Sequence, residues 1–595
     1  MASPSPRLVQ RLNPALVTAD TARRLPRWVP WVLMAAYILP GFLGRDPWRT
    51  QDLSAFAVML DMHRGGPWWT PEVLGAPADA LAWLPYWLGA LALSVLPLPA
   101  ELAVRVPFAG LLGLTLAATW YATYHLAREP AAQPLSLAFG GEAHPADYAR
   151  ALADGALLVM VATLGLAMLA HEATPTAAQL GFAALVFYAV ALGLRSPRNA
   201  ALVPGWMSVA LWWAGVWGWA LSGGPVPMLV VSAAGAWWWW RSGHPARVWG
   251  SAALGSLGAA GAAFALALAA DRAIELIPLR LGAWSNLAAW QGFGRLLAWF
   301  LWPAAAFALW TLWRWRGRWR EPHIGWPATA AALAVGITFL NGGDDRSLLL
   351  ALPPLAALAA FALPTLRRSV SALVDWFAVL FFTGAATLVW LIWIAMQTGI
   401  PPKPAANIAR LLPGFEPTLD ARLVLPALVA TAAWIGAVAW RLGRCAPALW
   451  RGVVLSASGL TLNWVLLMTL WLPLLNYGLG QAPVSQRMAA LVAPGDCVLV
   501  HGLDAARIAG LQHHGGLQVW RLGQPDAPRC RWLVAMPADF PGLARKEDLS
   551  DWQLRTELPR LRENRERWLV FERRSEAPAQ ADGDGLRTDS MPNPR

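Results

Sequence analysis

Charged residues and cysteines are both scarce in this chain. Only 14% of its 595 residues are Asp, Glu, Lys or Arg, and there are 3 cysteines. His513 and His514 are adjacent and have no Cys or acidic partner at the interval that a metal site needs. No repeat with a period of roughly 20 to 50 residues is present, so nothing indicates a repeat architecture. We therefore expect neither a metal site nor a required cofactor.

The chain is instead rich in long apolar stretches. They recur from Trp28 to Pro473, each about 20 residues long and able to cross a hydrocarbon core of about 30 Å. The mean hydropathy is +0.42, and many of the 39 Trp stand at the ends of these stretches, where indole anchors to a membrane interface. The chain is predicted to be a polytopic α-helical membrane protein with about thirteen transmembrane helices. The predicted spans are residues 28–43, 103–127, 151–171, 176–195, 200–220, 224–241, 248–271, 293–313, 326–341, 346–364, 374–397, 424–442 and 448–473.

The first apolar run, 28–43, follows an arginine-rich segment. No small-residue cleavage site comes after it, so we interpret it as a retained span and not as a signal peptide. The net charge of +12 is compatible with nucleic-acid binding, but the arginines are spread one or two per connection. That distribution is typical of an orientation signal, and no nucleic-acid partner is expected.

The same arginines predict the orientation. The short apolar segment 83–98 is treated as an interfacial or re-entrant helix, because counting it as a span would invert every later connection. With that assignment the arginine-rich connections share one side, and the connections 172–175 and 221–223 on the other side hold no basic residue. The N-terminus is then cytoplasmic, and the C-terminal region is external.

The composition changes after the last span. Short runs at 498–500, 517–520, 532–535 and 568–571 have the pattern of strands, and 503–513 has that of a helix. A small α/β domain is therefore predicted. The predicted parts are a cytoplasmic segment 1–27, a membrane domain 28–473 with the external loop 44–102 and the cytoplasmic insertion 128–150, a periplasmic α/β domain 474–573 and a disordered tail 574–595.

Two cysteines, Cys497 and Cys530, fall in the predicted external domain, each at the edge of a predicted strand. An oxidising compartment favours a disulfide between them. Two buried free thiols are the alternative, since the sequence carries no Cα distance. The third cysteine, Cys445, is predicted to lie in a cytoplasmic connection.

Residues 44–62 place a cluster of polar side chains directly after the first span. The cluster consists of Asp46, Trp48, Arg49, Gln51 and Asp52. A single membrane anchor needs no such cluster. Because Asp46 precedes Pro47, a turn-capping role is one interpretation. A direct chemical role for Asp46 or Asp52 is the other.

Two further polar groups stand at predicted external ends of spans. His171 and Glu172 form either a satisfied helix terminus or part of an external cavity. Asp344, Asp345 and Arg346 form either an internally salt-bridged turn or a phosphate site, because arginine presents a bidentate fork to phosphate. Both pairs of interpretations stay open.

These motifs resemble those of bacterial family-39 glycosyltransferases, GT-C enzymes that include the lipid A aminoarabinose transferases and are distantly related to protein O-mannosyltransferases. Gln51-Asp52 stands at the position of the family's acidic pair. The other similar motifs are Gly75-Ala76-Pro77, Pro85-Tyr86-Trp87-Leu88, Arg105-Val106-Pro107 and Leu352-Pro353-Pro354-Leu355. The resemblance covers most of the chain, including the external α/β region.

The chain departs from the family at three places. Gln51 replaces one residue of the acidic pair, so Asp52 or Asp46 would serve alone. The family's Glu-Lys-Pro-Pro, whose Lys contacts the donor phosphate, corresponds to residues 80–83, which contain no Lys. The family's Ser-Tyr-Arg near the last span is replaced at 480–482. These departures concern the chemistry and leave the architecture unchanged.

The resemblance implies a glycosyltransferase of the bacterial inner membrane. It would move a sugar from a polyprenyl-phosphate-linked donor to a lipid of the lipid A type, or to another cell-envelope acceptor, on the periplasmic face. Asp52 or Asp46 would act as general base or orient the acceptor. Arg346 or Arg49 would hold the departing phosphate. The other expected substrate-binding residues are Trp48, Gln51, Tyr86, His171, Glu172, Asp344 and Asp345.

Two other functions stay open. A catalytically altered relative would keep the fold and act in lipid binding or envelope assembly. A transporter is less favoured, because coupled transporters usually place ionisable residues near the bilayer midplane. Here Asp154 and Asp375 lie close to predicted cytoplasmic ends.

Overall fold

The structure is a computed structural model that describes residues 14–574, except for 16, 24, 136–140, 195–204, 444–447, 548 and 561–566. The contacts divide the chain into two compact units. The first extends to Gln481 and also includes Ala505–Ala509, and the second comprises Ala482–Asp504 and the residues from Gly510 onward. Cys445 and nearly all of the predicted disordered tail lie outside the described residues.

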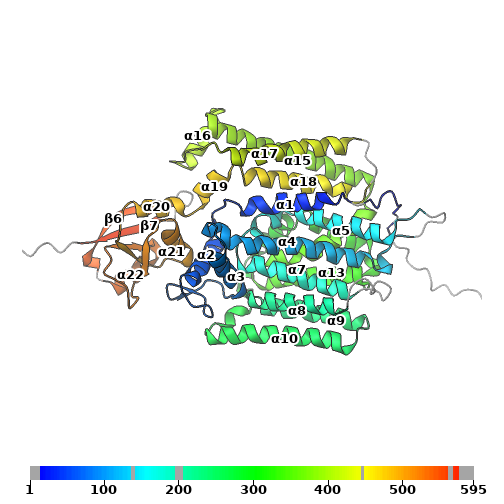
Figure 1. Ribbon diagram of the computed structural model, residues 1–595, viewed down its shortest axis with the longest axis horizontal. Coiled ribbons are helices and arrows are strands. Elements are labelled where there is room, and N and C mark those ends of the chain that lie inside the picture. Colours follow the sequence, from blue (N-terminus) through cyan, green and yellow to red (C-terminus); the bar gives the residue numbers. More distant parts are fainter. Residues whose placement is uncertain are drawn as a thin grey trace, which may run out of the picture. The chain divides into compact units, whose positions relative to one another are not determined.

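The first unit is a bundle of helices (Figure 1). Proline often stands at the first helical positions, as in α5, α7, α9 and α13, where its missing N–H costs no helical bond. The longer helices are α1 (Trp28–Phe42), α2 (Thr50–His63), α3 (Leu84–Val95), α4 (Ala100–Ala127), α5 (Pro145–Ala162), α7 (Pro175–Gly193), α8 (Gly205–Leu221), α9 (Pro225–Arg241), α10 (Ala246–Ala269), α11 (Leu287–Phe300), α12 (Ala304–Arg314), α13 (Pro322–Leu340), α15 (Arg368–Thr398), α17 (Ala421–Leu442) and α18 (Arg451–Leu467). The shorter ones are α6 (Leu164–Leu169), α14 (Leu352–Ala360), α16 (Pro402–Leu411) and α19 (Leu472–Leu479).

Among the described residues, 7 helices are long and apolar enough to cross a membrane, or up to 9 if each of two bent pairs is one span. The class of polytopic helical membrane protein is thereby confirmed. The predicted count of about thirteen spans is larger, because the prediction also counted apolar segments whose helices are shorter than this criterion requires. It included short segments such as α1, which is a helix of only 15 residues.

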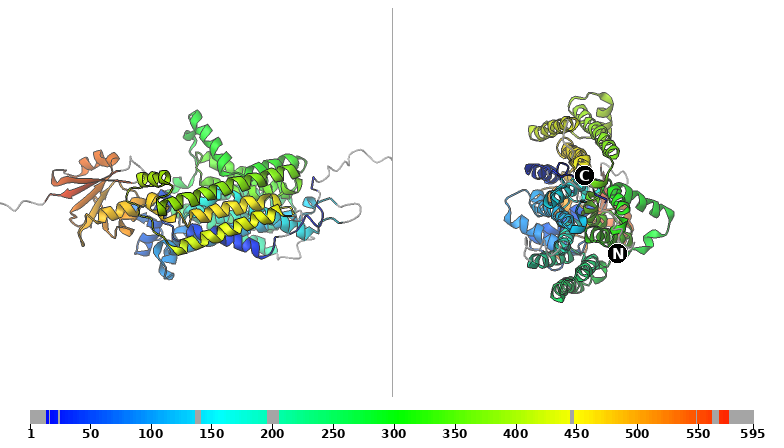
Figure 2. Two further views of the ribbon diagram at one scale, coloured as in Figure 1. Left: turned by 90° about the horizontal axis from the view of Figure 1, so that it is seen from above. Right: turned by 90° about the vertical axis from the view of Figure 1, so that its right-hand side faces the viewer.

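Two predicted spans are bent rather than straight. The span 293–313 is divided into α11 and α12, which meet at 89°, and the span 448–473 into α18 and α19, which meet at 66°. Pro303 stands at the first break, where a residue without an N–H cannot continue the helical ladder. As a result, α11 leans out of the bundle (Figure 2).

The segment 83–98, which we treated as interfacial, forms the 12-residue helix α3. At about 1.5 Å per residue it is roughly 18 Å long, which is too short for a span. The backbone N–H of Trp83, just before α3, donates to the carbonyl oxygen of Leu221 at 2.9 Å. The loop 44–102, between α1 and α4, is thus fixed to the end of α8.

The bundle core is formed by α4, α5, α7 and α14, whose facing residues are largely Ala, Leu and Val. Small residues allow the close approach of membrane helices. For example, a Cβ on Gly215 of α8 would lie 2.7 Å from Cγ2 of Val186 on α7. In contrast, α15 and α17, which run along one edge of the bundle, are mostly exposed (Figure 1). Lipid is the expected environment of these two apolar helices.

The second unit contains a mixed sheet with the strand order β4-β3-β5-β7-β6. The first three of these pair in parallel, and β7 is antiparallel to both of its neighbours. The strands are β3 (Cys497–His501), β4 (Gln518–Arg521), β5 (Trp532–Ala535), β6 (Trp552–Pro559) and β7 (Arg567–Arg573). Four of them match the strands predicted from the sequence. The edge strand β6 was missed because most of its side chains are exposed and carry no apolar alternation.

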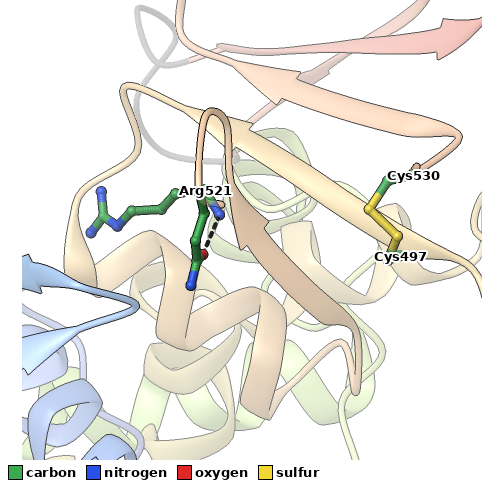
Figure 3. Close-up of a disulfide and its surroundings, with 4 residues drawn as sticks. Cys497, Arg521 and Cys530 are labelled. Carbon is green, nitrogen blue, oxygen red and sulfur yellow. Dashed lines mark hydrogen bonds between the residues drawn. A yellow bond between two sulfur atoms is a disulfide. The ribbon is translucent and has the colours of Figure 1, made fainter. Parts of the chain in front are cut away.

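Cys497 and Cys530 form a disulfide in this unit, with their Cα atoms 5.0 Å apart (Figure 3). Cys497 begins β3, and Cys530 lies just before β5, the parallel neighbour of β3. Both cysteines are buried in an apolar cluster with Leu533 and Phe571. Of the two alternatives that the sequence left open, the structure has the bridge.

Candidate functional site

Glu172 lies in the turn between α6 and α7 and is fully buried. Three arginine side chains surround it. Arg346 donates to its Oε2 atom, and Oε1 lies 3.8 Å from Nε of Arg49 and 3.9 Å from Nη2 of Arg45. A buried carboxylate is tolerated only with such charged partners. Arg49 also reaches Asp345, with Nη1 3.5 Å from Oδ2, at the more exposed edge of the group.

Asp52 is held by two other elements. Its Oδ2 atom lies 3.3 Å from Nη2 of Arg105 on α4, and its Oδ1 atom accepts the backbone N–H of Ala173 at 2.9 Å. Arg105 also donates to the carbonyl oxygen of Arg45. The side chains of Asp52 and Arg105 are both 1% exposed. Asp52 therefore joins α2, α4 and the α6–α7 turn.

These two groups share the α6–α7 turn and form one arginine–carboxylate network. Its members are Arg45, Arg49, Asp52, Arg105, Glu172, Asp345 and Arg346. Burial raises the pKa of Glu172, the charge of Asp52 acts in the same direction, and Arg346 and Arg45 oppose them. Burial also lowers the pKa of Arg45 to about 10, so this side chain stays charged at neutral pH. Four arginines face three carboxylates, which leaves the network with a positive surplus.

His171 and Asp46 contact groups that hold the fold together. The ring nitrogens of His171 face the carbonyl oxygens of Ala167 and Tyr37, and its ring packs against Trp464. Asp46 is half-buried, and its backbone N–H donates to Oδ1 of Asn476 at 3.1 Å. His171 thus supports the turn before Glu172 from inside the bundle.

Asn476 of α19 fixes the loop that follows α1. Its Oδ1 atom also accepts Nε1–H of Trp48 at 2.8 Å, and its Nδ2 atom donates to the carbonyl oxygen of Gly44 at 2.9 Å. Arg45 then packs over the ring of Trp48, 4.5 Å from its centroid. Trp48, which we expected to bind substrate, is buried between these partners.

A cavity of about 530 Å³ opens in the same unit. Its wall includes the start of α2, the start of α7, the loop 275–280 and the turn after α13. The polar and charged side chains that line it are Gln51, Ser54, Asp79, Tyr86, Thr176, Gln179, Ser222, Glu275, Arg280, Asn341, Asp344 and Ser347. Of the expected site residues, only Gln51, Tyr86 and Asp344 belong to this lining.

Among the carboxylates that line the cavity, Asp79 is hydrogen-bonded to α2. Its Oδ2 atom accepts the hydroxyl of Ser54 at 2.5 Å, and its side chain is exposed to the cavity. Ser54 lies three positions after Gln51, so the two share one face of α2. The hydroxyl of Tyr86 donates to the carbonyl oxygen of Ala80 at 2.8 Å. Asp79 is therefore held against the face of α2 that also carries Gln51.

The other carboxylates of the lining come from distant segments. Asp344 accepts both the N–H and the hydroxyl of Ser347, at 3.0 and 2.9 Å. Glu275 forms an ion pair with Arg272, which donates in turn to the carbonyl oxygen of Ala78 at 2.7 Å. Among the described residues that line the cavity, no three His, Cys, Asp or Glu ligand atoms meet at one point. The absence of a metal requirement stays a prediction.

Several residues of the network and of the cavity lining were not predicted from the sequence, and five of them enter the argument below. They are Arg45, Ser54, Asp79, Glu275 and Arg280. Arg105 was named only within a resemblance motif, although an arginine inside an apolar helix is itself a signal of function. Asp79 and Arg280 lie in irregular segments and Glu275 in a 3-10 helix of four residues, where no periodic pattern marks them.

Two solved structures are similar to this chain over nearly its full length. The crystal structure of ArnT from Cupriavidus metallidurans bound to undecaprenyl phosphate has a TM-score of 0.60, with 17% sequence identity over 92% of this chain and 98% of that chain. The same protein in the apo state has a TM-score of 0.59 and 16% identity, over 91% of this chain and 97% of that chain. No family model matches the chain. No curated protein matches it either. The likeness confirms the predicted fold class.

Proposed function

We propose that this protein is a GT-C glycosyltransferase that moves a sugar from a polyprenyl-phosphate donor to an acceptor of the cell envelope. The observation that carries the proposal is the cavity of about 530 Å³, with carboxylates and an arginine in its wall, on the fold of ArnT. The acceptor would be a lipid or glycan on the periplasmic face of the inner membrane. The arginine–carboxylate network supports the loop 44–102 from which much of the wall is built.

The chemistry of glycosyl transfer determines which catalytic groups the cavity must contain. The acceptor hydroxyl or amine attacks C1 of the sugar, and the bond between C1 and the phosphate oxygen breaks. The electron pair of that bond goes to the polyprenyl phosphate, and the acceptor's proton goes to a carboxylate. The site therefore needs a base near the acceptor and a cation near the departing phosphate.

Asp79 is our candidate for the base. Its carboxylate lines the same cavity as Gln51, the neutral residue at the first position of the family's acidic pair, and accepts the hydroxyl of Ser54 on α2. In our sequence analysis Asp52 or Asp46 had this role. Asp52 does not line the cavity, and both of its oxygens are engaged by Arg105 and Ala173. We propose that Asp52 is a positioning residue that holds α2, and with it Gln51 and Ser54.

Arg280 and Arg49 are our candidates for the phosphate site. Arg280 lines the cavity and is exposed. Arg49 does not line the cavity, but its side chain is 40% exposed at the edge of the network and two positions before Gln51, which does. Arg346, the other arginine that we expected to contact phosphate, is only 6% exposed and donates to Glu172. Arg346 would therefore act through Glu172 and not by direct contact with the donor.

Mass spectrometry of envelope glycolipids tests this function. In cells that carry the gene, we expect one lipid or glycan species heavier by one glycosyl unit, which disappears when the gene is deleted. Asp79→Asn should lower that product by about two to four orders of magnitude, the range for loss of a general base. The control is Glu72→Gln, a carboxylate of the same loop that does not line the cavity. Equal product from Asp79→Asn and wild type would exclude Asp79 as the base.

Gln51 favours a second candidate function, a lipid-binding protein without transferase activity. A neutral amide at this position cannot take a proton from an acceptor. In that case the purified protein would bind undecaprenyl phosphate, but deletion of the gene would change no glycolipid. Binding without any product thus separates this candidate from the enzyme.

A further inference from the structure

A second cavity, of about 340 Å³, lies at the end of the bundle opposite the candidate site. It is formed by the first turns of α1, the C-terminal half of α4 and the start of α5. Most of its wall is apolar, including Trp31, Leu116 and Leu157, and two arginines, Arg27 and Arg150, belong to the same wall. We call this cavity the arginine-lined groove. Its size lies within the usual range of small-molecule sites, roughly 300 to 1,000 Å³.

The groove has a buried polar anchor. Asp154 is 4% exposed, and its oxygens accept the backbone N–H of Leu25 at 3.0 Å and Nε1–H of Trp120 at 2.9 Å. These bonds hold the segment before α1 against α4 and α5. These hydrogen bonds of Asp154 fix the shape of the groove. The two arginines of the wall, Arg27 and Arg150, are more exposed than Asp154.

Both arginines are accessible to a ligand. Arg27 is exposed, and the Arg150 side chain is 40% exposed. Arg150 lies 3.5 Å from Asp147, but Asp147 is itself 51% exposed, and such surface pairs contribute little. An anion that contacts both arginines would therefore displace only a weak interaction.

The residues around the groove are those of a membrane interface. Trp28, Trp31 and Tyr121 are 65%, 72% and 48% exposed, as expected of side chains in the aromatic belt. The arginine distribution predicts that this end of the bundle is cytoplasmic. Basic pockets between transmembrane helices on that side are suited to anionic headgroups.

We propose that the arginine-lined groove binds one anionic glycerophospholipid. Its phosphate would contact Arg27 and Arg150, which present bidentate forks to phosphate oxygens. One acyl chain would lie along the apolar wall past Trp31 and Leu116. This site is separate from the cavity of the proposed transferase, and the inference holds whether or not the protein transfers a sugar.

Native mass spectrometry of the purified full-length protein tests the inference. The protein in mild detergent is incubated with phosphatidylglycerol, phosphatidylcholine or undecaprenyl phosphate at equal concentrations, and bound lipid is counted. We expect phosphatidylglycerol to be retained at least about tenfold more than phosphatidylcholine. Replacement of one arginine, Arg27→Gln or Arg150→Gln, should weaken phosphatidylglycerol binding about fivefold, and the double variant about thirtyfold.

Two further variants test separately whether binding needs the apolar wall for the acyl chain and whether it depends on the arginines of the groove or on any arginine of that side. Ala117→Phe fills the apolar wall while both arginines remain, and it should also release the lipid. Arg241→Gln removes an arginine of the same predicted side, at the end of α9, that does not line the groove. It should leave binding unchanged. Unfolding temperatures of all variants show whether a loss of lipid reflects a loss of fold.

Four results would overturn the proposal. They are unchanged phosphatidylglycerol binding in the double variant, equal loss in Arg241→Gln, equal retention of phosphatidylcholine, and an Arg27- and Arg150-dependent preference for undecaprenyl phosphate. The last result would assign the groove to a polyprenyl carrier instead of a glycerophospholipid.

Discussion

Asp52 and Arg105 form a buried ion pair, with Oδ2 of the carboxylate 3.3 Å from Nη2 of the guanidinium. The second oxygen of Asp52 accepts the backbone N–H of Ala173. A single carboxylate therefore fixes α2 against α4 and against the turn that carries Glu172. The geometry of the cavity wall depends on this pair, although neither side chain belongs to the wall.

Asp52→Asn should lower the free energy of unfolding by about 3 to 5 kcal/mol, because Arg105 would stay buried without its counter-charge. Thermal unfolding in detergent measures this effect. In the double variant Asp52→Asn with Arg105→Met, the unpaired charge is gone, so the loss should be smaller than in the single variant. A general base without a structural role predicts the opposite result, unchanged stability with a loss of transfer.

The stability of the loop 44–102 should depend on pH through Asp61 and Glu72. Burial raises the pKa of Asp61 from 3.8, and burial together with the charge of Asp61 raises the pKa of Glu72 from 4.5. The folded state therefore binds protons more tightly than the unfolded state. Its stability from these groups is complete below these two reference values and is lost as the pH rises through the raised ones.

Asp61→Asn is the variant that checks this dependence. The amide resembles the protonated acid, so the variant should unfold at a higher temperature than wild type at pH 7 and show a flatter pH profile between about pH 4 and 7. Unfolding temperatures measured across that range give both quantities. A steeper profile in the variant would contradict the assignment.

Arg280→Gln should reduce kcat/KM for a polyprenyl-phosphate-linked sugar by about ten- to hundredfold, as expected for loss of one charge-assisted hydrogen bond. Arg49→Gln should act in the same direction. The control is Arg295→Gln, an exposed arginine of α11 that does not line the cavity. If all three variants are equally active, the phosphate lies elsewhere.

Alkylation of the denatured, non-reduced protein should label one of its three cysteines, Cys445. Prior reduction should expose the other two. The bridge between Cys497 and Cys530 closes a loop of 33 positions, and Cys497→Ser should lower stability by about 3 to 4 kcal/mol. Labelling of all three cysteines without reduction would show that the bridge does not form in the cell.

The orientation can be measured with reporter fusions. Fusions at residue 135 should report the cytoplasm, and fusions at 285 and 520 should report the periplasm. The reason is the arginine bias, which places the connections around α5 on the cytoplasmic side. A cytoplasmic signal at 520 would show that the number of crossings is even.

Hydropathy was sufficient to predict the fold class, because each long helix carries its own apolar signal. Where a helix was bent or short, hydropathy alone was misleading. Residues 293–313 form one apolar run in the sequence, yet Pro303 divides it into α11 and α12. A hydropathy average over a window of residues does not detect that one residue, Pro303, lacks the backbone N–H that a continuous helix needs.

The network was partly predictable for a similar reason. Arg49, Glu172 and Arg346 each stand at a predicted external end of a span, so topology alone brings them to one end of the bundle. The cavity wall was not predictable. Asp79 reaches its place through contacts such as that between Arg272 and Ala78, which are 194 positions apart. Such pairings depend on the packing of irregular loops, for which a single sequence carries no signal.

The contact of Asn476 with the loop after α1 sets an order of events during biosynthesis. The backbone N–H of Asp46 and its acceptor Asn476 are separated by 430 positions. At about 5 to 20 residues per second, the ribosome needs roughly 20 to 90 s to make the intervening chain. Throughout that interval the nascent loop has left the ribosome without its partner in α19. The arrangement of Trp48 and Arg45 is thus completed only after α19 has been made, and a chain truncated before α19 would be inserted in the membrane with an unfinished site.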